Sequence, residues 1–435
     1  MRKLAVEILS KINDENSNST KLLNENCKNL NNIDNNFLRE IVYGTLENRI
    51  YLDYIIRKLC KLRLKKFDIK ILNILRISIY QLLFMDKVPE FAVLNEAVNL
   101  TKVFKLKRFS SFVNGSLRNF LRNKEKFSKI DTNSLEDKIS IKYSTNLDLV
   151  KILLSDYKKE KTEEILENSL LKPHFSIRIS SFKKSEQEVV EDLKALGYEI
   201  KKCTISKRTY FVKNPTDIIN TESFKNGDFT VQDVASILVC ESLDAKKNSS
   251  ILDICAAPGG KSAHVAFLMD NTGSILANDI VKSKLKKIKE NLKRLNITNV
   301  TLSNFDGCIF KSELKEKFDY VICDVICSGV GVIDRKPEIK LFRNLEQIEN
   351  IIQKQRKIFD NAIKYLKPNG KIIYSTCSIL NMENEENVKY FLEKYKDLEI
   401  EKINFLDKKV DYIKLLPEKR KHNGFFIVKF KKGSS

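Results

Sequence analysis

The clearest indication of the fold lies in the segment Ile251-Leu252-Asp253-Ile254-Cys255-Ala256-Ala257-Pro258-Gly259-Gly260-Lys261. It passes from an apolar strand through a turn of small residues into a helix that we predict over residues 262–269. Small residues let backbone N–H groups approach a ligand closely, and the helix N-terminus favours negative charge. The turn is neither G-x-G-x-x-G nor G-x-x-x-x-G-K-[ST], which disfavours a dinucleotide or a nucleoside triphosphate as the ligand.

Aspartates follow two further strand-like runs. Asp279 and Asp306 come directly after residues 274–278 and 300–305. In an open parallel sheet the ligand crevice lies outside the carboxyl ends of the strands, where an acidic side chain suits the two hydroxyls of a ribose. Each aspartate taken alone is more often a loop cap or a solvated residue than a ligand contact. Their recurrence at successive strand ends favours a nucleoside-type cofactor.

Two cysteines lie at similar positions. Cys327 follows the predicted strand 318–323, and Cys377 follows the predicted strand 371–374. Both sulfurs are therefore expected to face one pocket. A thiolate attacks an electron-poor ring carbon well near neutral pH, so the pair predicts nucleophilic catalysis. The alternative is that each cysteine is a small buried hydrophobe.

Together, the small-residue turn, Asp324 with Cys327-Ser328-Gly329, and Ser375-Thr376-Cys377-Ser378 resemble the motifs of RNA (cytosine-5) methyltransferases. With its N-terminal part, the chain resembles the RsmB (Sun, Fmu) type, whose usual target is the cytosine at position 967 of 16S ribosomal RNA. The resemblance implies S-adenosylmethionine as the cofactor. The residues that it places around the cofactor are Cys255, Ala256, Ala257, Pro258, Gly259, Gly260, Lys261, Asp279, Asp306 and Asp324.

The resemblance also assigns catalytic roles. Cys377 would attack cytosine C6, after which C5 is electron-rich enough to take the methyl group, and Cys327 would serve product release. Asp324 would hydrogen-bond the N3/N4 edge of the base. The alternative, in which Cys327 attacks, is the arrangement of DNA cytosine-5 methyltransferases.

The chain departs from the family pattern at two places. Ile326 stands where proline is usual, and Asp334 replaces the first of two adjacent arginines. The second change leaves Arg335 and Lys336 to meet phosphate. Because proline would fix the backbone before Cys327, the position of that thiol depends on whatever else holds the loop.

The composition is typical of a globular protein with a polyanionic partner. The chain has 435 residues, enough for roughly three domains, and a formal net charge of +21. A general excess of lysine, as in proteins from AT-rich genomes, is the alternative source of that charge. Nine cysteines without a C-x-x-C pair and three dispersed histidines disfavour disulfides, a zinc site and metal catalysis. Residues 1–15 lack a signal-peptide core, and residues 71–85 are too short and too charged to span a bilayer. We therefore predict a cytoplasmic monomer.

Three domains are expected. Residues 1–125 show helical spacing and resemble a NusB-like RNA-binding bundle, although a helical bundle with a solvated basic face fits as well. A connector is predicted over 123–142, and the domain expected over 126–225 also holds helices at 147–157 and 163–170 and a small α+β, RRM-like element. Residues 226–435 alternate strands and helices, which predicts an α/β Rossmann-like methyltransferase core. In its opening segment, Gln232 is a candidate contact of the cofactor or base, and Asp233 a helix cap.

The expected function is S-adenosylmethionine-dependent methylation of cytosine C5 in 16S ribosomal RNA, either naked or in a small-subunit assembly intermediate. One alternative is the same chemistry on another nucleic acid. The other is a ribosome-assembly factor that binds RNA without catalysis.

Overall fold

The computed structural model describes residues 1–12, 19–27, 30–171, 174–418 and 422–434. They form two compact units, Met1–Leu170 with Ile333–Leu345, and Leu171–Val332 with Glu346–Ser435. The boundaries expected at residues 125 and 225 divide the chain differently and stay predictions. Within the described ranges, no helix is long and apolar enough to cross a membrane.

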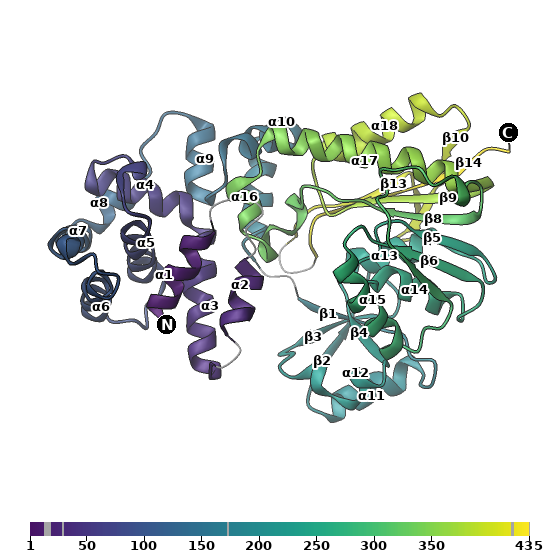
Figure 1. The fold of residues 1–435 in the computed structure, drawn as a ribbon, viewed down its shortest axis with the longest axis horizontal. Coiled ribbons are helices and arrows are strands. Elements are labelled where there is room, and N and C mark those ends of the chain that lie inside the picture. The colour runs from purple at the N-terminus through teal and green to yellow at the C-terminus, as the bar shows by residue number, and fades with distance from the viewer. Residues whose placement is uncertain (13–18, 28–29, 172–173, 419–421, 435) are drawn as a thin grey trace. The chain divides into compact units, whose positions relative to one another are not determined.

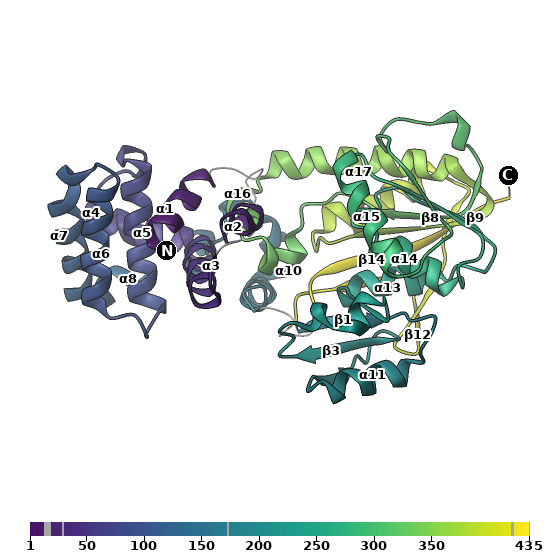
Figure 2. The ribbon, with the colours of Figure 1, turned by 60° about the horizontal axis from the view of Figure 1, so that its bottom comes forward.

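The first unit is helical. Its helices are α1 (Arg2–Lys11), α2 (Ser19–Asn26), α3 (Asn32–Glu47), α4 (Arg49–Cys60), α5 (Ile69–Phe84), α6 (Glu90–Val103), α7 (Ser110–Arg122), α8 (Lys124–Ser128), α9 (Leu135–Tyr143), α10 (Leu147–Asn168) and α16 (Glu338–Phe342), with short 3₁₀ turns at Leu64–Lys66 and Lys107–Phe109. Helix α5 is buried on all sides over residues 71–82, because its neighbours α1, α3, α4, α6 and α7 pack around it. Figure 2 shows α4, α5, α6 and α7 running alongside one another. The predicted all-α bundle is confirmed.

The stretch that we expected to be a connector is largely helical. It contains α8 and nearly all of α9, whose Ile139 and Ile141 are buried. The Tyr54 hydroxyl, which donates to the Lys129 carbonyl and accepts from the Asp131 backbone N–H, fixes the chain between the two helices. Because the exposed positions of this stretch are charged, its sequence did not indicate that Ile139 and Ile141 are buried. The helices predicted at 147–157 and 163–170 are the two halves of α10, which bends at Lys158 (φ 59°).

A distant piece of the chain completes this unit. The backbone N–H of Ser19 donates to Glu338 Oε1 (2.7 Å), and that of Asn146 to the Lys340 carbonyl (2.7 Å). Lys340 is only 1% exposed, and its Nζ donates to the Tyr143 carbonyl (2.9 Å). Burial lowers the pKa of Lys340 to about 8, with a small opposing effect from Glu47. Residues 333–345 are therefore part of the helical core rather than a surface loop.

The second unit begins with a small α+β element. Its antiparallel sheet has the order β2-β3-β1-β4. The elements are β1 (Phe175–Ile179), α11 (Glu186–Ala195), β2 (Glu199–Lys202), β3 (Thr209–Lys213), a 3₁₀ turn at Ile218–Asn220, α12 (Glu222–Lys225) and β4 (Phe229–Val231). Ile177, Ile179, Val189, Leu193 and Phe229 form its core. The small α+β element that we predicted is confirmed.

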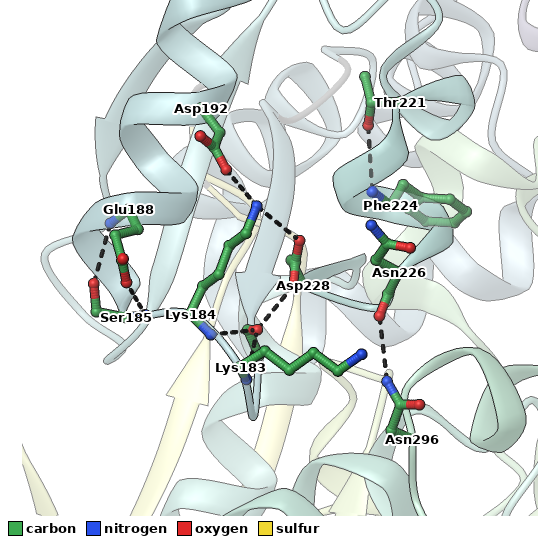
Figure 3. A network of polar contacts seen from close by, with 11 residues as sticks. Lys183, Lys184, Ser185, Glu188, Asp192, Thr221, Phe224, Asn226, Asp228 and Asn296 are labelled. Carbon is green, nitrogen blue, oxygen red and sulfur yellow. Dashed lines mark hydrogen bonds and ion pairs between the residues drawn. The ribbon is translucent and has the colours of Figure 1, made fainter.

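Polar contacts brace this element around Asp228 (Figure 3). Asp228 accepts from the Ser181 hydroxyl (2.8 Å) and lies 3.7 Å from Lys184 Nζ. Thr221 caps α12 through the Phe224 backbone N–H, and Asn296 Nδ2 donates to the Asn226 carbonyl (3.3 Å). The last of these bonds ties the small element to the core that follows.

The core contains a sheet of eight strands within the described residues, in the order β10-β14-β9-β8-β5-β6-β7 with β13 paired to β14. The strands are β5 (Ser250–Asp253), β6 (Ser274–Asn278), β7 (Val300–Ser303), β8 (Phe318–Asp324), β9 (Leu366–Thr376), β10 (Leu398–Ile400), β13 (Tyr412–Leu415) and β14 (Phe425–Lys432), and β11 (Ile403–Phe405) with β12 (Lys408–Val410) forms a separate hairpin. Strands β5 to β9 are parallel, and β14 pairs antiparallel with β9, β10 and β13.

Helices cover both faces of this sheet (Figure 1). Helices α13 (Val234–Leu243), α14 (Gly260–Leu268) and α15 (Lys282–Arg294) lie on one face, and α17 (Leu345–Tyr365) and α18 (Glu385–Lys394) on the other, with 3₁₀ turns at Ser312–Leu314, Val330–Arg335 and Asn381–Glu383. Alternate strand residues enter two separate cores: Ile251, Tyr320 and Ile373 in one, Leu252, Val321 and Ile372 in the other. A sheet buried on both faces requires such continuous apolar strands. The predicted α/β Rossmann-like core is confirmed.

Candidate active site

The small-residue turn joins β5 to α14 in the predicted place. Gly259 has φ +93°, and a Cβ on it would come 2.8 Å from the Ile288 side chain, so only glycine fits. The Ala256 backbone N–H donates to the Asn278 carbonyl (2.7 Å), which fixes the turn against β6. Cys255 lies in the turn, and burial raises its pKa well above the usual range. The turn thus presents backbone, rather than bulky side chains, at the carboxyl edge of the sheet.

Asp279 and Asp306 both hold loop backbone. Asp279 is 7% exposed, and its two oxygens accept from the backbone N–H groups of Ala257 (3.2 Å) and Val281 (2.9 Å). Asp306 Oδ1 accepts from the Cys308 N–H (2.9 Å). The capping role that we weighed is therefore present. Because each carboxylate oxygen has two lone pairs, it leaves capacity for a ligand hydroxyl.

Sequence reasoning missed Asn278, which links three strand ends. Its Nδ2 donates to the carbonyls of Ile254 and Phe305, both at 3.0 Å, and its Oδ1 accepts from the Phe305 N–H (2.8 Å). These partners follow β5 and β7, the two neighbours of β6. An asparagine that ends a strand carries no sequence signal for such a long-range role.

Asp253, the last residue of β5, has an unsatisfied oxygen. Its Oδ2 accepts from the Ser262 hydroxyl (2.6 Å), but its buried Oδ1 has no hydrogen-bond partner among the described residues. Burial raises the pKa of Asp253 to about 7. An orphaned carboxylate oxygen beneath the turn suits a ligand that brings an N–H donor.

Asp324 is held on both sides. Its Oδ2 lies 2.7 Å from Lys261 Nζ, and its Oδ1 accepts from the Ser375 hydroxyl (2.6 Å). Burial alone would lower the pKa of Lys261, but the Asp324 carboxylate and other nearby acidic groups raise it above its ordinary value. Lys261 therefore stays protonated, and the ion pair fixes the direction of Asp324.

The two predicted cysteines are in direct contact. Strands β8 and β9 are parallel neighbours with Asp324 opposite Ser375, so the residues after them meet at one edge. Cys327 Sγ lies 3.0 Å from Cys377 Sγ. The hydrogen bond to Cys377, burial and the adjacent negative charge raise the pKa of Cys327 well above its ordinary value. Cys327 thus holds its proton firmly, and either sulfur can be the donor of this contact.

Glu383 was also missed. It is fully buried, and its carboxylate accepts from the backbone and hydroxyl of Ser328 and from the hydroxyl of Ser378. Gln355 Nε2 donates to Glu383 Oε1 and to the Ile326 carbonyl, both at 2.9 Å. A glutamate shortly before α18 looks like an ordinary first-turn residue in sequence. The carbonyl of Ile326, the residue before Cys327, is thus held by a side-chain hydrogen bond.

A buried arginine that we did not anticipate contacts the segment before α13. Asp233 accepts from the Ala235 N–H, as expected of a helix cap. Gln232 Oε1 accepts from Arg178 Nη1 (2.5 Å), which also donates to the Gly260 carbonyl (3.2 Å). Arg178 is fully buried, and burial lowers its pKa to about 10. It links the small α+β element to the turn beside the site.

Comparison with known proteins agrees with this architecture. A family model described as 16S rRNA methyltransferase RsmB/F matches residues 240–431, and a NusB family model matches residues 1–122. The probable ribosomal RNA small subunit methyltransferase B of Bacillus subtilis is 34% identical over 99% of this chain and 98% of its own. The chain belongs to the ribosomal RNA small subunit methyltransferase B family. As a member of that family it is an S-adenosylmethionine-dependent methyltransferase of small-subunit ribosomal RNA.

Other family B relatives and solved structures extend the match. The family B enzyme of Proteus mirabilis is 30% identical over 98% of this chain and 97% of its own. The crystal structure of PH0851 has a TM-score of 0.80 at 22% identity over 99% of each chain. A methyltransferase homologue from Pyrococcus horikoshii has a TM-score of 0.62 at 25% identity, covering 69% of this chain and 100% of its own. The fold of this chain is therefore matched by a solved structure over 99% of its length.

Proposed function

We propose that this methyltransferase modifies C5 of a cytosine in 16S ribosomal RNA through a covalent bond between Cys377 and C6 of the base. The observation that carries the proposal is the 3.0 Å contact between the Cys327 and Cys377 sulfurs, with Asp324 close by in the same strand ends. A single thiol would serve as a nucleophile, whereas a thiol that keeps its proton beside it suits a reaction in which the first thiolate must later leave.

Each protein group then has one task. The Cys377 thiolate adds to C6, which makes C5 nucleophilic, and Asp324 orients the N3/N4 edge of the base. Once C5 carries the methyl group, solvent water takes the C5 proton. The electron pair of that C–H bond re-forms the C5–C6 double bond, and the bond from C6 to the Cys377 sulfur breaks with its electron pair on sulfur. Cys327 donates its proton to the departing Cys377 sulfur, 3.0 Å away. The raised pKa of Cys327 keeps that proton available until this step.

The cofactor fits the edge of β5 and β6. S-adenosylmethionine supplies the methyl group from its sulfonium, and it also carries an ammonium group, a carboxylate and a ribose. The orphaned Asp253 Oδ1 suits the ammonium group, and the free lone pairs of Asp279 suit the ribose hydroxyls. The backbone N–H groups of residues 255–261 suit the carboxylate. Asp306 completes this set of proposed cofactor residues.

The test is base-resolution mapping of 5-methylcytosine on unmodified 16S ribosomal RNA incubated with the protein and S-adenosylmethionine. One new methylcytosine is the expected result, and an unmodified small-subunit assembly intermediate is run in parallel. Methylation at another atom would contradict the proposed chemistry. Cofactor binding without methylation of either substrate would favour a different RNA or a non-catalytic assembly factor. Action as a cytoplasmic monomer stays a prediction.

A further inference from the structure

Glu383 is an unusual carboxylate, because it is fully buried without a cationic partner. Its Oε1 accepts from the Ser328 backbone N–H (2.8 Å) and from Gln355 Nε2 (2.9 Å), and its Oε2 accepts from the hydroxyls of Ser328 and Ser378, both at 2.5 Å. No ion pair of Glu383 occurs within the part of the chain that the structure describes. Burial of an unpaired charge is costly unless hydrogen bonds satisfy it, and here four neutral donors do so.

The donors identify what the carboxylate joins. Ser328 follows Cys327 and Ser378 follows Cys377, so one side chain spans the two loops that carry the thiols. The serine hydroxyls also lie 3.1 Å from each other. Gln355 bonds both Glu383 and the carbonyl of Ile326, so Cys327 is held through the residues on each side of it.

Glu383 is itself held from the sheet. Its backbone carbonyl accepts from the Tyr374 hydroxyl (2.7 Å) and from Asn387 Nδ2 (3.1 Å). Tyr374 lies in β9 and Asn387 in α18, and both side chains are buried. The backbone of Glu383 is therefore fixed, so its carboxylate cannot move along with either cysteine loop.

We propose that Glu383 is a positioning residue that keeps the Cys327 and Cys377 sulfurs in contact during the reaction. This inference rests on the proposed cytosine chemistry for its catalytic consequence, but the contact itself can be tested without RNA. Without the carboxylate, the Ser328 and Gln355 N–H groups and the two serine hydroxyls lose their shared acceptor. The backbone bond from the Gly331 N–H to the Cys377 carbonyl (3.0 Å) still joins the loops, but the residue after each cysteine is no longer held, so the sulfurs can move apart. A displacement of about 1 Å at reacting atoms can lower a rate by about 10²-fold.

The first experiment measures the contact directly in the full-length protein. Diamide removes two electrons and two protons from a pair of thiols, which yields one disulfide and the reduced hydrazine. Peptide mass spectrometry then quantifies the Cys327–Cys377 disulfide over time. We expect rapid formation in the parent protein and at least tenfold slower formation in Glu383→Ala, with Glu383→Gln between them because the amide keeps one oxygen acceptor. Equal rates in all three proteins would overturn the inference.

The matched control is Glu386→Gln, which makes the same chemical change at an exposed residue of α18. It should cross-link at the parent rate. If Glu383→Ala fails to fold, the double variant Ser328→Ala with Ser378→Ala removes the two hydroxyl contacts from the other side and should slow the cross-link in the same way. An unchanged rate of disulfide formation in a folded double variant would contradict the positioning role of Glu383.

The second experiment measures catalysis. Glu383→Ala should lower kcat by about 10²-fold with little change in the KM for RNA, and Glu383→Gln should recover part of the loss. A rise in KM alone would contradict a positioning role. If the parent protein forms no 5-methylcytosine, the proposed function fails, while the cross-linking result still decides whether Glu383 holds the thiols.

Discussion

The roles proposed for Cys377 and Cys327 differ, so alanine variants of the two cysteines should behave differently. Cys377→Ala removes the nucleophile and should abolish turnover without trapping RNA. Cys327→Ala leaves the attack intact but removes the proton donor 3.0 Å from the departing sulfur, so a denaturation-stable protein–RNA adduct should accumulate. A denaturing gel with labelled RNA and S-adenosylmethionine distinguishes the two outcomes. The reverse pattern would assign the attack to Cys327.

Lys340 should make the stability of the protein depend on alkaline pH. Burial lowers its pKa from 10.5 to about 8 in the folded state. Between these values the unfolded chain binds the proton more tightly, so the free energy of unfolding should rise as the pH rises from about 8 to 10.5, by about 3 kcal/mol at most. Below pH 8 Lys340 is protonated in both the folded and the unfolded state, so it adds no pH dependence to the free energy of unfolding there.

Urea unfolding at pH 7.5 and 9.5 measures this dependence. In Lys340→Met the same buried volume carries no ionisable group, so the rise with pH should be smaller than in the parent protein. An identical pH dependence in both proteins would show that Lys340 is not buried in its neutral form.

At the scale of one element, α15 is strongly basic. It carries seven lysine and arginine residues and one glutamate, and no ion pair of its lysines is found among the residues that the structure describes. Lys282, Lys286, Lys289 and Lys293 follow one another at helical spacing on an exposed stripe. The helix packs against the small-residue turn through Ile288 and through Asn291 Nδ2, which donates to the Pro258 carbonyl. We expect this stripe to bind RNA phosphates next to the site.

Lys282→Gln with Lys286→Gln should weaken RNA binding and its salt dependence. The slope of log K against log salt should become shallower by about 0.7 for each phosphate of single-stranded RNA that the protein no longer neutralises. The affinity for S-adenosylmethionine should be unchanged. Lys246→Gln with Lys247→Gln is the control for the loss of two exposed lysines. These residues precede β5, at the amino-terminal end of the parallel strands, and each lies near an aspartate, Asp244 or Asp270. Equal slopes in the two double variants would exclude α15 from the RNA interface.

The elements of the core were predictable, because their signals are local. A strand such as β8 is buried on both faces and reads as a continuous apolar run, and the turn at Gly259 uses residues that tolerate few alternatives. The polar residues that connect distant segments of the core were not predictable. Asn278, Glu383 and Arg178 act through partners far away in sequence, and their residue types are common in loops and helices. The cysteine pair was predictable only because parallel neighbours bring their carboxyl ends together.

For the whole molecule, the helical unit should depend on residues 333–345. A protein of residues 1–170 lacks the bonds from Ser19 to Glu338 and from Asn146 to Lys340, each worth about 1 kcal/mol. We expect it to unfold at a lower temperature than the same fragment joined by a glycine–serine linker to residues 333–345. Thermal unfolding followed by circular dichroism measures the difference. A fusion with a scrambled 333–345 sequence is the control, and equal melting temperatures would contradict the dependence.

The discontinuous first unit also sets an order of events during synthesis. When residue 170 leaves the ribosome, the place that Lys340 will fill is still empty, and about 175 further residues must be made before Leu345 is available. At about 5–20 residues per second this delay lasts roughly 10 to 35 seconds. Most of the catalytic unit emerges in that interval. The helical unit is translated first, but it can therefore reach its final fold only after much of the second unit has been synthesised.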